Sequence, residues 1–319
     1  HYTGALGLPE LRSAIAGFYA QRWNATVDPA RVIVTPGASG ALLLALGLLA
    51  GPGDEVLMAD PGYPCNRHFA GFCAARAVAI PVGAETAYQL NLDLIERHAS
   101  PATRVVLIAS PSNPTGTLIE QAELVRIHEW CAANGVALIV DEIYLALTYD
   151  GDERSAAAWD DVFVVNSFSK YFLMTGWRLG WLVAPTWALD GLERLAQNLY
   201  LAAPTPAQYA ALAAFSAETL TLLEARKADL QSRRDFLLPA LRGLGFELPV
   251  TPQGAFYLYA DCRHHTRDSF QFAQGLLDEV GVAVTPGLDF GHHQPGHFVR
   301  FAYTQPLTRL AEAIVRIKR

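Results

Sequence analysis

Two serines, a lysine and an arginine lie in one short segment, where they could hold an aldehyde and a phosphate. The segment is Ser167-Phe168-Ser169-Lys170-Tyr171-Phe172-Leu173-Met174-Thr175-Gly176-Trp177-Arg178. A lysine amine can condense with an aldehyde to form an imine, and an arginine with hydroxyl groups can bind a phosphate. A single lysine is usually a solvated surface residue. The chemical interpretation therefore depends on what the rest of the chain places around Lys170.

A second candidate anion site lies at a turn of small residues, Pro36-Gly37-Ala38-Ser39-Gly40. The apolar run Arg31 to Thr35 predicts a strand before this turn, and a helix is expected from about Ser39 to Ala50. Such a turn directs backbone N–H groups and a helix N-terminus toward one point. The turn is neither a G-x-G-x-x-G motif nor a P-loop, so it does not predict a nucleotide site. An ordinary tight turn is the alternative interpretation.

Three more polar or aromatic side chains follow predicted strands directly. Tyr63, Asn113 and Asp141 come after the apolar runs at 56–59, 105–109 and 136–140. Open α/β sheets bind ligands at the carboxyl ends of their strands, so these side chains are expected to share one crevice with Ser39 and Lys170. Considered separately, Tyr63 could pack a loop and Asp141 could cap a helix. Pyridoxal phosphate carries both an aldehyde and a phosphate and reacts through a lysine, so it suits this crevice.

The alternation of strands and helices predicts an α/β fold with a mostly parallel central sheet covered by helices on both faces. Residues 1–225 are expected to form a large domain that binds the cofactor. Residues 226–319 are expected to form a small α+β domain, because its predicted elements are shorter. The pattern from Thr205 to Leu241 predicts one long helix, either straight or kinked, that crosses the boundary.

The composition excludes several classes of protein. The chain has 319 residues, 51% of them hydrophobic and 17% charged, which describes a packed globular protein rather than a disordered one. A formal charge of −7 argues against general nucleic-acid binding. The longest apolar run, Ala41 to Ala50, is too short to span a membrane.

The cysteines and histidines predict neither a disulfide framework nor a metal site. The four cysteines form no C-x-x-C pair, so reduced thiols in a cytoplasmic protein are the simplest interpretation. His293 and His297 have the spacing of helical metal ligands, but Pro295 and Gly296 between them prevent a helix.

The ordered set of motifs resembles the class I/II aminotransferases, the fold-type I family that uses pyridoxal phosphate. The motifs are Tyr2, Pro36 to Gly40, Asp60-Pro61-Gly62-Tyr63-Pro64, Asn113-Pro114-Thr115-Gly116, Asp141-Glu142-Ile143-Tyr144, Ser167 to Lys170, Gly176-Trp177-Arg178-Leu179-Gly180 and Arg300. The resemblance covers nearly the whole chain. It implies an enzyme that moves an amino group between an L-amino acid and a 2-keto acid and works as a homodimer. No nucleic-acid or membrane partner is expected, because the composition argues against both.

The resemblance also implies roles for the residues of the crevice. Lys170 would hold pyridoxal phosphate as a Schiff base and move a proton between the substrate and the cofactor. Asp141 would pair with the protonated ring nitrogen, and Tyr63 would stack on the ring. Asn113 and Tyr144 would hydrogen-bond the phenolic oxygen. Lys170, Asp141 and Tyr144 would thus be the catalytic residues.

The remaining implied roles concern anions. The phosphate would be held by Ala38, Ser39, Ser167, Ser169, Arg178 and the partner subunit's Tyr2. Arg300 and Asn113 would bind the α-carboxylate of the substrate. A guanidinium suits this role because it can form two hydrogen bonds with a carboxylate. No second arginine is assigned to a substrate side chain, so the amino acid stays open. Tyr2, Tyr63, Phe256 and Tyr257 indicate a neutral or aromatic substrate, although aromatic residues are just as often packing. Pyruvate or 2-oxoglutarate is expected as acceptor.

Two features depart from the family pattern. Several dozen residues normally precede the segment that begins here at Tyr2, so the sequence is expected to be N-terminally incomplete, with weakened activity and dimerisation if that segment is absent. Ala38 replaces a common glycine, a mild change because the contact uses the backbone.

The same residues are compatible with other functions. The same cofactor shell could serve a decarboxylase, a β-eliminating lyase or an oxidase-type reaction. A non-catalytic module built on the aminotransferase fold is the alternative from a different class.

Overall fold

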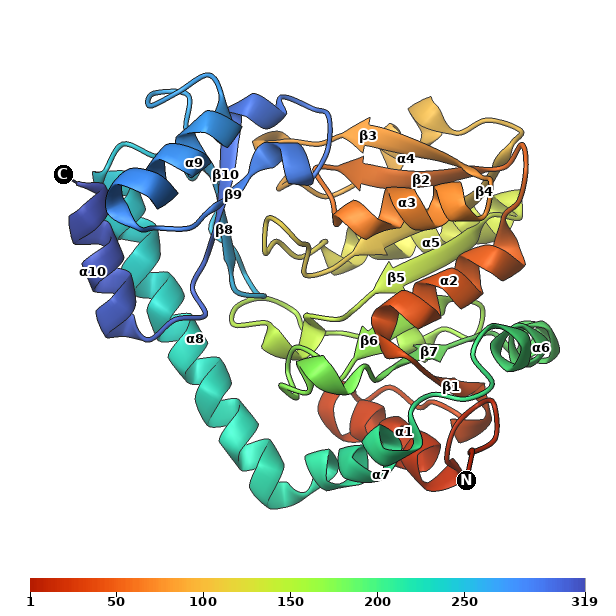
Figure 1. The fold of residues 1–319 in the computed structure, drawn as a ribbon. Helices are drawn as coiled ribbons and strands as arrows, with labels where there is room; N and C mark the ends of the chain where they lie inside the picture. Colours follow the sequence, from red (N-terminus) through yellow and green to blue (C-terminus); the bar gives the residue numbers. More distant parts are fainter. Residues whose placement is uncertain (319) are drawn as a thin grey trace.

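Ten strands form two separate sheets among residues 1–318, the part of the chain that the computed structural model describes (Figure 1). The larger sheet has seven strands in the order β1-β7-β6-β5-β4-β2-β3. They are β1 (Val32–Thr35), β2 (Glu55–Asp60), β3 (Arg76–Pro81), β4 (Thr103–Ala109), β5 (Ala137–Asp141), β6 (Phe163–Ser167) and β7 (Gly180–Val183). Neighbouring strands from β3 to β6 pair in parallel, whereas β7 is antiparallel to both β1 and β6. The expected mostly parallel sheet is therefore confirmed.

Helices cover both faces of this sheet because its strands are apolar on both sides. In β4, Val105 and Leu107 face one core cluster, and Val106 and Ile108 face the other. The first cluster includes residues of α2 (Gly37–Leu49), α3 (Pro64–Phe72) and α6 (Leu189–Leu199). The second includes residues of α1 (Pro9–Trp23), α4 (Leu92–His98), α5 (Gln121–Asn134) and α7 (Thr205–Leu212). The period-2 alternation thus places one layer of helices on each face.

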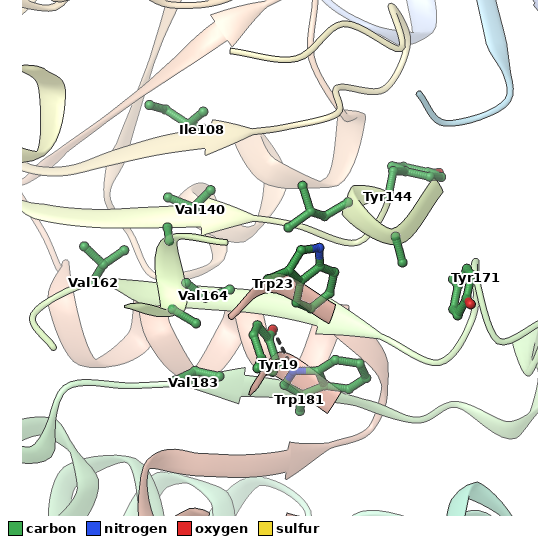
Figure 2. Close-up of a cluster of buried hydrophobic side chains, with 14 of the residues drawn as sticks. Tyr19, Trp23, Ile108, Val140, Tyr144, Val162, Val164, Tyr171, Trp181 and Val183 are labelled. Atoms are coloured by element: carbon green, nitrogen blue, oxygen red, sulfur yellow. Dashed lines mark hydrogen bonds between the residues drawn. The ribbon is translucent and has the colours of Figure 1, made fainter. Parts of the chain in front are cut away.

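Aromatic side chains fill the core beneath α1 (Figure 2). Tyr19 and Trp23 of α1 belong to the same buried cluster as Trp181 of β7. The indole of Trp181 is fully buried and donates a hydrogen bond to the Tyr19 hydroxyl at 3.1 Å. Because both polar atoms are satisfied, these large rings add apolar burial without leaving a buried polar group unpaired.

The smaller sheet is antiparallel and has its own core. Its order is β8-β10-β9, with β8 (Tyr257–Asp261), β9 (Thr285–Pro286) and β10 (Phe298–Ala302). It is accompanied by α9 (Ser269–Val280) and α10 (Leu307–Ile317). The 27-residue helix α8 (Ala217–Gly243) runs from α7 along one side of the molecule to this sheet (Figure 1). The division at residue 225 falls inside α8 and stays a prediction.

The predicted single helix from Thr205 to Leu241 is wrong. The chain forms α7, then a 3₁₀ turn at Ala213–Phe215, and then α8. Ser216 is extended, and its side chain accepts a hydrogen bond from the backbone N–H of Thr219 at 3.2 Å. The apolar pattern alone did not reveal this cap, which starts a new helix.

The structure of residues 1–318 contains neither a membrane-spanning helix nor a cluster of metal ligands. No helix in that range is long and apolar enough to cross a membrane. No three His, Cys, Asp or Glu side chains in that range are grouped as metal ligands.

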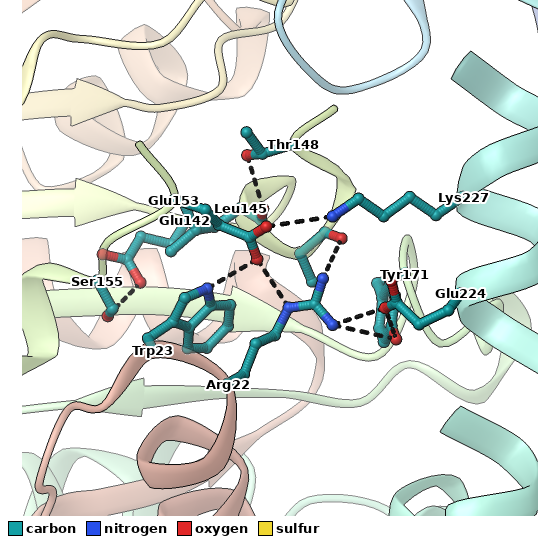
Figure 3. A network of polar contacts seen from close by, with 11 residues as sticks. Arg22, Trp23, Glu142, Leu145, Thr148, Glu153, Ser155, Tyr171, Glu224 and Lys227 are labelled. Carbon is teal, nitrogen blue, oxygen red and sulfur yellow. Dashed lines mark hydrogen bonds and ion pairs between the residues drawn. The ribbon is translucent and has the colours of Figure 1, made fainter. Parts of the chain in front are cut away.

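A polar network joins α8 to α1, to the loop that contains Glu153 and to the lysine segment (Figure 3). Glu153 accepts hydrogen bonds from Arg22 at 2.7 Å, Trp23 at 2.8 Å and Lys227 of α8 at 3.1 Å. Glu224 of α8 pairs with Arg22 at 2.6 Å and accepts a hydrogen bond from the Tyr171 hydroxyl at 2.5 Å. Because Tyr171 directly follows Lys170, the network connects the lysine segment to α8, the helix that leads to the small sheet.

Tyr171→Phe should therefore destabilise the protein. The change keeps the buried ring but removes the donor to Glu224, which costs about 1 kcal/mol because the carboxylate is half exposed. Thermal unfolding should occur about 2 °C lower. Tyr209→Phe is the control, since Tyr209 is 61% exposed. Equal unfolding temperatures for the two variants would show that this hydrogen bond does not stabilise the fold.

Candidate active site

A cavity of about 360 Å³ opens between the carboxyl ends of the large sheet and the small sheet. Sequence-predicted residues from both sheets line it: Ala38, Ser39, Tyr63, Asn113, Asp141, Tyr144, Ser167, Ser169, Lys170, Arg178 and Arg300. Segments that are far apart in the sequence thus meet at one point. Tyr2 is the exception, since it is 79% exposed and lines a surface hollow with residues 202–206.

One end of the cavity is built to receive an anion. Ala38 and Ser39 lie in the first turn of α2, where free backbone N–H groups and the helix dipole favour negative charge. Two glycines allow close approach at this end. A Cβ on Gly180 would lie 2.7 Å from the backbone N of Ala38, and a Cβ on Gly37 would lie 2.7 Å from Nη2 of Arg178. The Arg178 guanidinium is therefore held against the start of α2.

The two serines at this end are ordered by the backbone. The Ser167 hydroxyl donates to the carbonyl of Leu179 at 3.1 Å and accepts from the N–H of Ser169 at 3.0 Å. Both serines are buried, and both line the cavity. Since β6 ends at Ser167 beside β7, the strand pair fixes where these hydroxyls lie.

The centre of the cavity holds Asp141 and Lys170. Asp141 ends β5, is buried, and accepts a hydrogen bond from the N–H of Ile143 at 3.1 Å. Burial raises the pKa of Asp141 to about 6, opposed by that hydrogen bond and by the charge of Lys170. Burial, and secondly the charge of Arg300, lower the pKa of Lys170, while Asp141 opposes them. The lowered pKa makes more of the neutral, nucleophilic amine available.

Aromatic groups surround the lysine. Its Nζ lies 5.8 Å from the centroid of the Tyr144 ring and 5.9 Å from that of Phe256. The hydroxyls of Tyr144 and Tyr257 are 2.9 Å apart and hydrogen-bonded. Burial is the main cause that raises the pKa values of Tyr63, Tyr144 and Tyr257, so all three phenols stay neutral at ordinary pH.

Arg300 reaches the cavity from the small sheet. Its Nη1 donates to the Asn113 side-chain oxygen at 2.7 Å, and its Nη2 donates to the Thr285 hydroxyl at 3.3 Å. Its Cζ lies 4.2 Å from the ring centroid of Tyr257 and 4.7 Å from that of Phe290. Among the described residues, its buried Nε has no hydrogen-bond partner. The guanidinium is thus oriented by two rings, an amide and a hydroxyl, and these use only two of its five N–H donors.

Asp289 and Phe290 line the cavity and were not predicted as site residues, whereas Tyr257 was expected only as one of the aromatic residues that indicate a neutral or aromatic substrate. Tyr257 is part of an apolar strand, where an aromatic residue usually indicates packing. Asp289 and Phe290 follow a short turn with no motif of its own. Only the placement of the small sheet against the large one brings these residues to the cavity.

Comparison with known proteins agrees with this geometry. The sequence profile of the family described as aminotransferase class I and II matches residues 1–317. A valine–pyruvate aminotransferase of Mycobacterium tuberculosis is 42% identical over 99% of this chain and 82% of its own length. An arginine–pyruvate transaminase of Pseudomonas aeruginosa is 34% identical over 99% of this chain and 81% of its own.

Solved structures agree as well. The crystal structure of an aminotransferase from Mycobacterium tuberculosis matches with a TM-score of 0.96 and 42% identity, over 100% of this chain and 83% of the other. A double mutant of Thermus thermophilus aspartate aminotransferase matches with a TM-score of 0.94 and 30% identity, over 100% and 83%. The chain therefore belongs to the class I and II aminotransferases, enzymes that transfer amino groups with pyridoxal phosphate.

Proposed function

We propose that Lys170 bonds covalently to pyridoxal phosphate and moves the proton during transfer of an amino group from an L-amino acid to a 2-keto acid. The observation that carries this proposal is a half-buried lysine of lowered pKa, in one cavity with a buried carboxylate and an anion-binding helix N-terminus. When bound, pyridoxal phosphate acts as an electron sink that weakens the bonds of the substrate α-carbon. Lys170 Nζ would take the α-proton and deliver it to C4′ of the cofactor.

The donor set of the cavity fits the cofactor. Ala38, Ser39, Ser167, Ser169 and Arg178 form the end that would hold the phosphate. Because Gly37 and Gly180 have no side chain, the Arg178 guanidinium and the start of α2 lie close together at this end of the cavity, which we call the phosphate cradle. The phosphate would satisfy N–H and guanidinium groups that face the cavity.

The other residues of the cavity would hold the ring. Asp141, once ionised, would pair with the protonated ring nitrogen and keep it charged. Tyr63 would stack on the ring, whereas Asn113 and Tyr144 would hydrogen-bond the phenolic oxygen. Asn113 already contacts Arg300 at 2.7 Å, so one amide would position both the cofactor and the substrate.

Arg300 would bind the α-carboxylate of the substrate. Its Nε, which has no hydrogen-bond partner among residues 1–318, and its packing against the rings of Tyr257 and Phe290 support this role, because a guanidinium held in one plane can bind a carboxylate with two hydrogen bonds. This contact would orient the α-proton toward Lys170. A misplaced α-carbon would reduce the rate even where the substrate still bound.

The phosphate cradle gives a direct prediction. Gly37→Ala should weaken the affinity for pyridoxal phosphate about tenfold or more, because Gly37 has φ +74° and the added Cβ would displace Arg178. Titration of the apoprotein with the cofactor measures this affinity. Gly47→Ala in the same helix is the control, since no atom lies within 4 Å of its added Cβ. Unchanged affinity in Gly37→Ala would show that the phosphate does not bind at this end of the cavity.

We also propose a cytoplasmic homodimer in which Tyr2 reaches the phosphate of the partner subunit. Exposed apolar side chains near Tyr2 support a second copy there. They are Leu199 and Leu201, which precede the residues that share a surface hollow with Tyr2. The four free cysteines suit a reducing compartment.

Turnover that depends on a keto acid distinguishes transamination from the other reactions of this cofactor. The protein is incubated with L-valine or L-arginine, the amino acids named in two relatives, with and without pyruvate. Transamination requires the keto acid and yields one alanine for each amino acid consumed. Release of carbon dioxide, or of ammonia without a keto acid, would instead indicate a decarboxylase, a lyase or an oxidase.

A further inference from the structure

The cavity contains one carboxylate that the proposed function does not use. Its ionisable lining residues besides the tyrosines are Asp141, Lys170, Arg178, Asp289 and Arg300. The three cations and Asp141 each have a proposed partner in the cofactor or in the substrate α-carboxylate. Asp289 has none, and its exposed side chain makes no ion pair with any residue from 1 to 318. A negative charge therefore remains on the wall of the substrate cavity.

The backbone of Asp289 is held in place. Its carbonyl accepts a hydrogen bond from Arg67 Nη2 at 3.1 Å. The next residue, Phe290, is 1% exposed, and its carbonyl accepts from the N–H of Gly62 at 2.9 Å. The Phe290 ring packs on Arg300, so Asp289 is fixed one residue away from the group that covers this guanidinium.

This placement sets the charge that a substrate side chain meets. An amino acid whose α-carboxylate binds Arg300 extends its side chain within the same cavity. A second carboxylate on that side chain would be repelled by Asp289, whereas a neutral side chain would not be affected and a cationic one would be attracted. In a partly solvated cavity, such an interaction between two charges changes affinity about three- to tenfold.

We propose that Asp289 is a specificity-determining residue that makes the site favour neutral and cationic amino acids over acidic ones. It likewise favours monocarboxylic 2-keto acids over dicarboxylic ones as amino acceptors. This inference rests on the proposed binding of the α-carboxylate by Arg300.

Asp289→Asn tests the inference, because it removes the charge and keeps the shape. The holoenzyme is mixed separately with L-alanine, L-arginine and L-glutamate, and kcat/KM of the half-reaction is measured for each. The ratio for glutamate over alanine should rise about three- to tenfold, and the ratio for arginine over alanine should fall. Both changes should shrink at high salt, since the charge is exposed. Glu279→Gln, which removes an exposed charge from α9 outside the cavity, should change neither ratio.

A binding measurement separates this inference from the proposed function. Succinate and butyrate are titrated calorimetrically into the holoenzyme, so that no turnover is needed. Asp289→Asn should bind succinate about three- to tenfold more tightly and butyrate unchanged. Succinate affinity that stays within twofold of wild type would overturn the role of Asp289. If Arg300→Gln bound butyrate as tightly as wild type, the assignment of Arg300 as the α-carboxylate site would be wrong. The inference about Asp289 would then also be wrong, because it rests on that assignment.

Discussion

Lys170→Ala is expected to abolish amino-group transfer, with kcat lower by about four orders of magnitude or more. The variant loses the amine that bonds to the cofactor and the base that moves the α-proton. Residual binding of pyridoxal phosphate should persist, because the cradle at the start of α2 and Asp141 are unchanged. Steady-state turnover of an amino acid with pyruvate measures the loss.

The chain offers a clean control for this prediction. It has three lysines, Lys170, Lys227 and Lys318, and of these only Lys170 lines the cavity. Borohydride reduction of the cofactor-loaded protein followed by peptide mass analysis should place the added mass on Lys170. Lys318→Ala should keep both turnover and labelling. Turnover by Lys170→Ala, or label on another lysine, would contradict the assignment.

Asp141→Asn is expected to lower kcat about 10²- to 10³-fold, the second-largest effect. Asparagine keeps the size of the side chain and can still accept the hydrogen bond from the N–H of Ile143. It cannot supply the negative charge that would hold the ring nitrogen protonated. The half-reaction rate measures the loss. Asp190→Asn, a change of the same kind at an exposed position of α6 outside the cavity, should leave the rate with L-alanine unchanged.

The same carboxylate predicts how cofactor binding depends on pH. Burial raises the pKa of Asp141 to about 6 in the free protein, so the side chain is neutral below that pH and ionised above it. Only the ionised form can pair with a protonated ring nitrogen. Affinity for pyridoxal phosphate should therefore fall as the pH drops below about 6. Asp141→Asn should remove this step, and an unchanged step in the variant would assign it to another group.

Much of the large-domain half of the site was predictable because its polar residues lie at or shortly after the ends of apolar runs. Asp141 and Ser167 end strands β5 and β6, and parallel strands bring their carboxyl ends to one edge. Helix α2 was expected for the same reason, since the turn at Gly37 and Ala38 interrupts a regular apolar pattern. Local pattern and sheet geometry were sufficient for these residues.

The small-domain half could not be found in this way. Asp289 and Phe290 reach the cavity only because α8 and its contacts with Glu153 and Arg22 place the small sheet over the large one. Nothing local indicates that geometry. The break before α8 was missed similarly, because Ser216 acts through its cap and not through the apolar period. Arg300 was found only because the resemblance to a family supplied its role.

The central claim is that this cavity carries out the amino-group half-reaction on Lys170. The most direct test is an absorbance spectrum of the protein loaded with pyridoxal phosphate, before and after adding amino acids without a keto acid. We expect a long-wavelength band that an amino acid converts to the pyridoxamine form, and that returns when pyruvate is added. A band that no amino acid changes would contradict transamination at this site. Failure to form any band with added cofactor would contradict the assignment of Lys170.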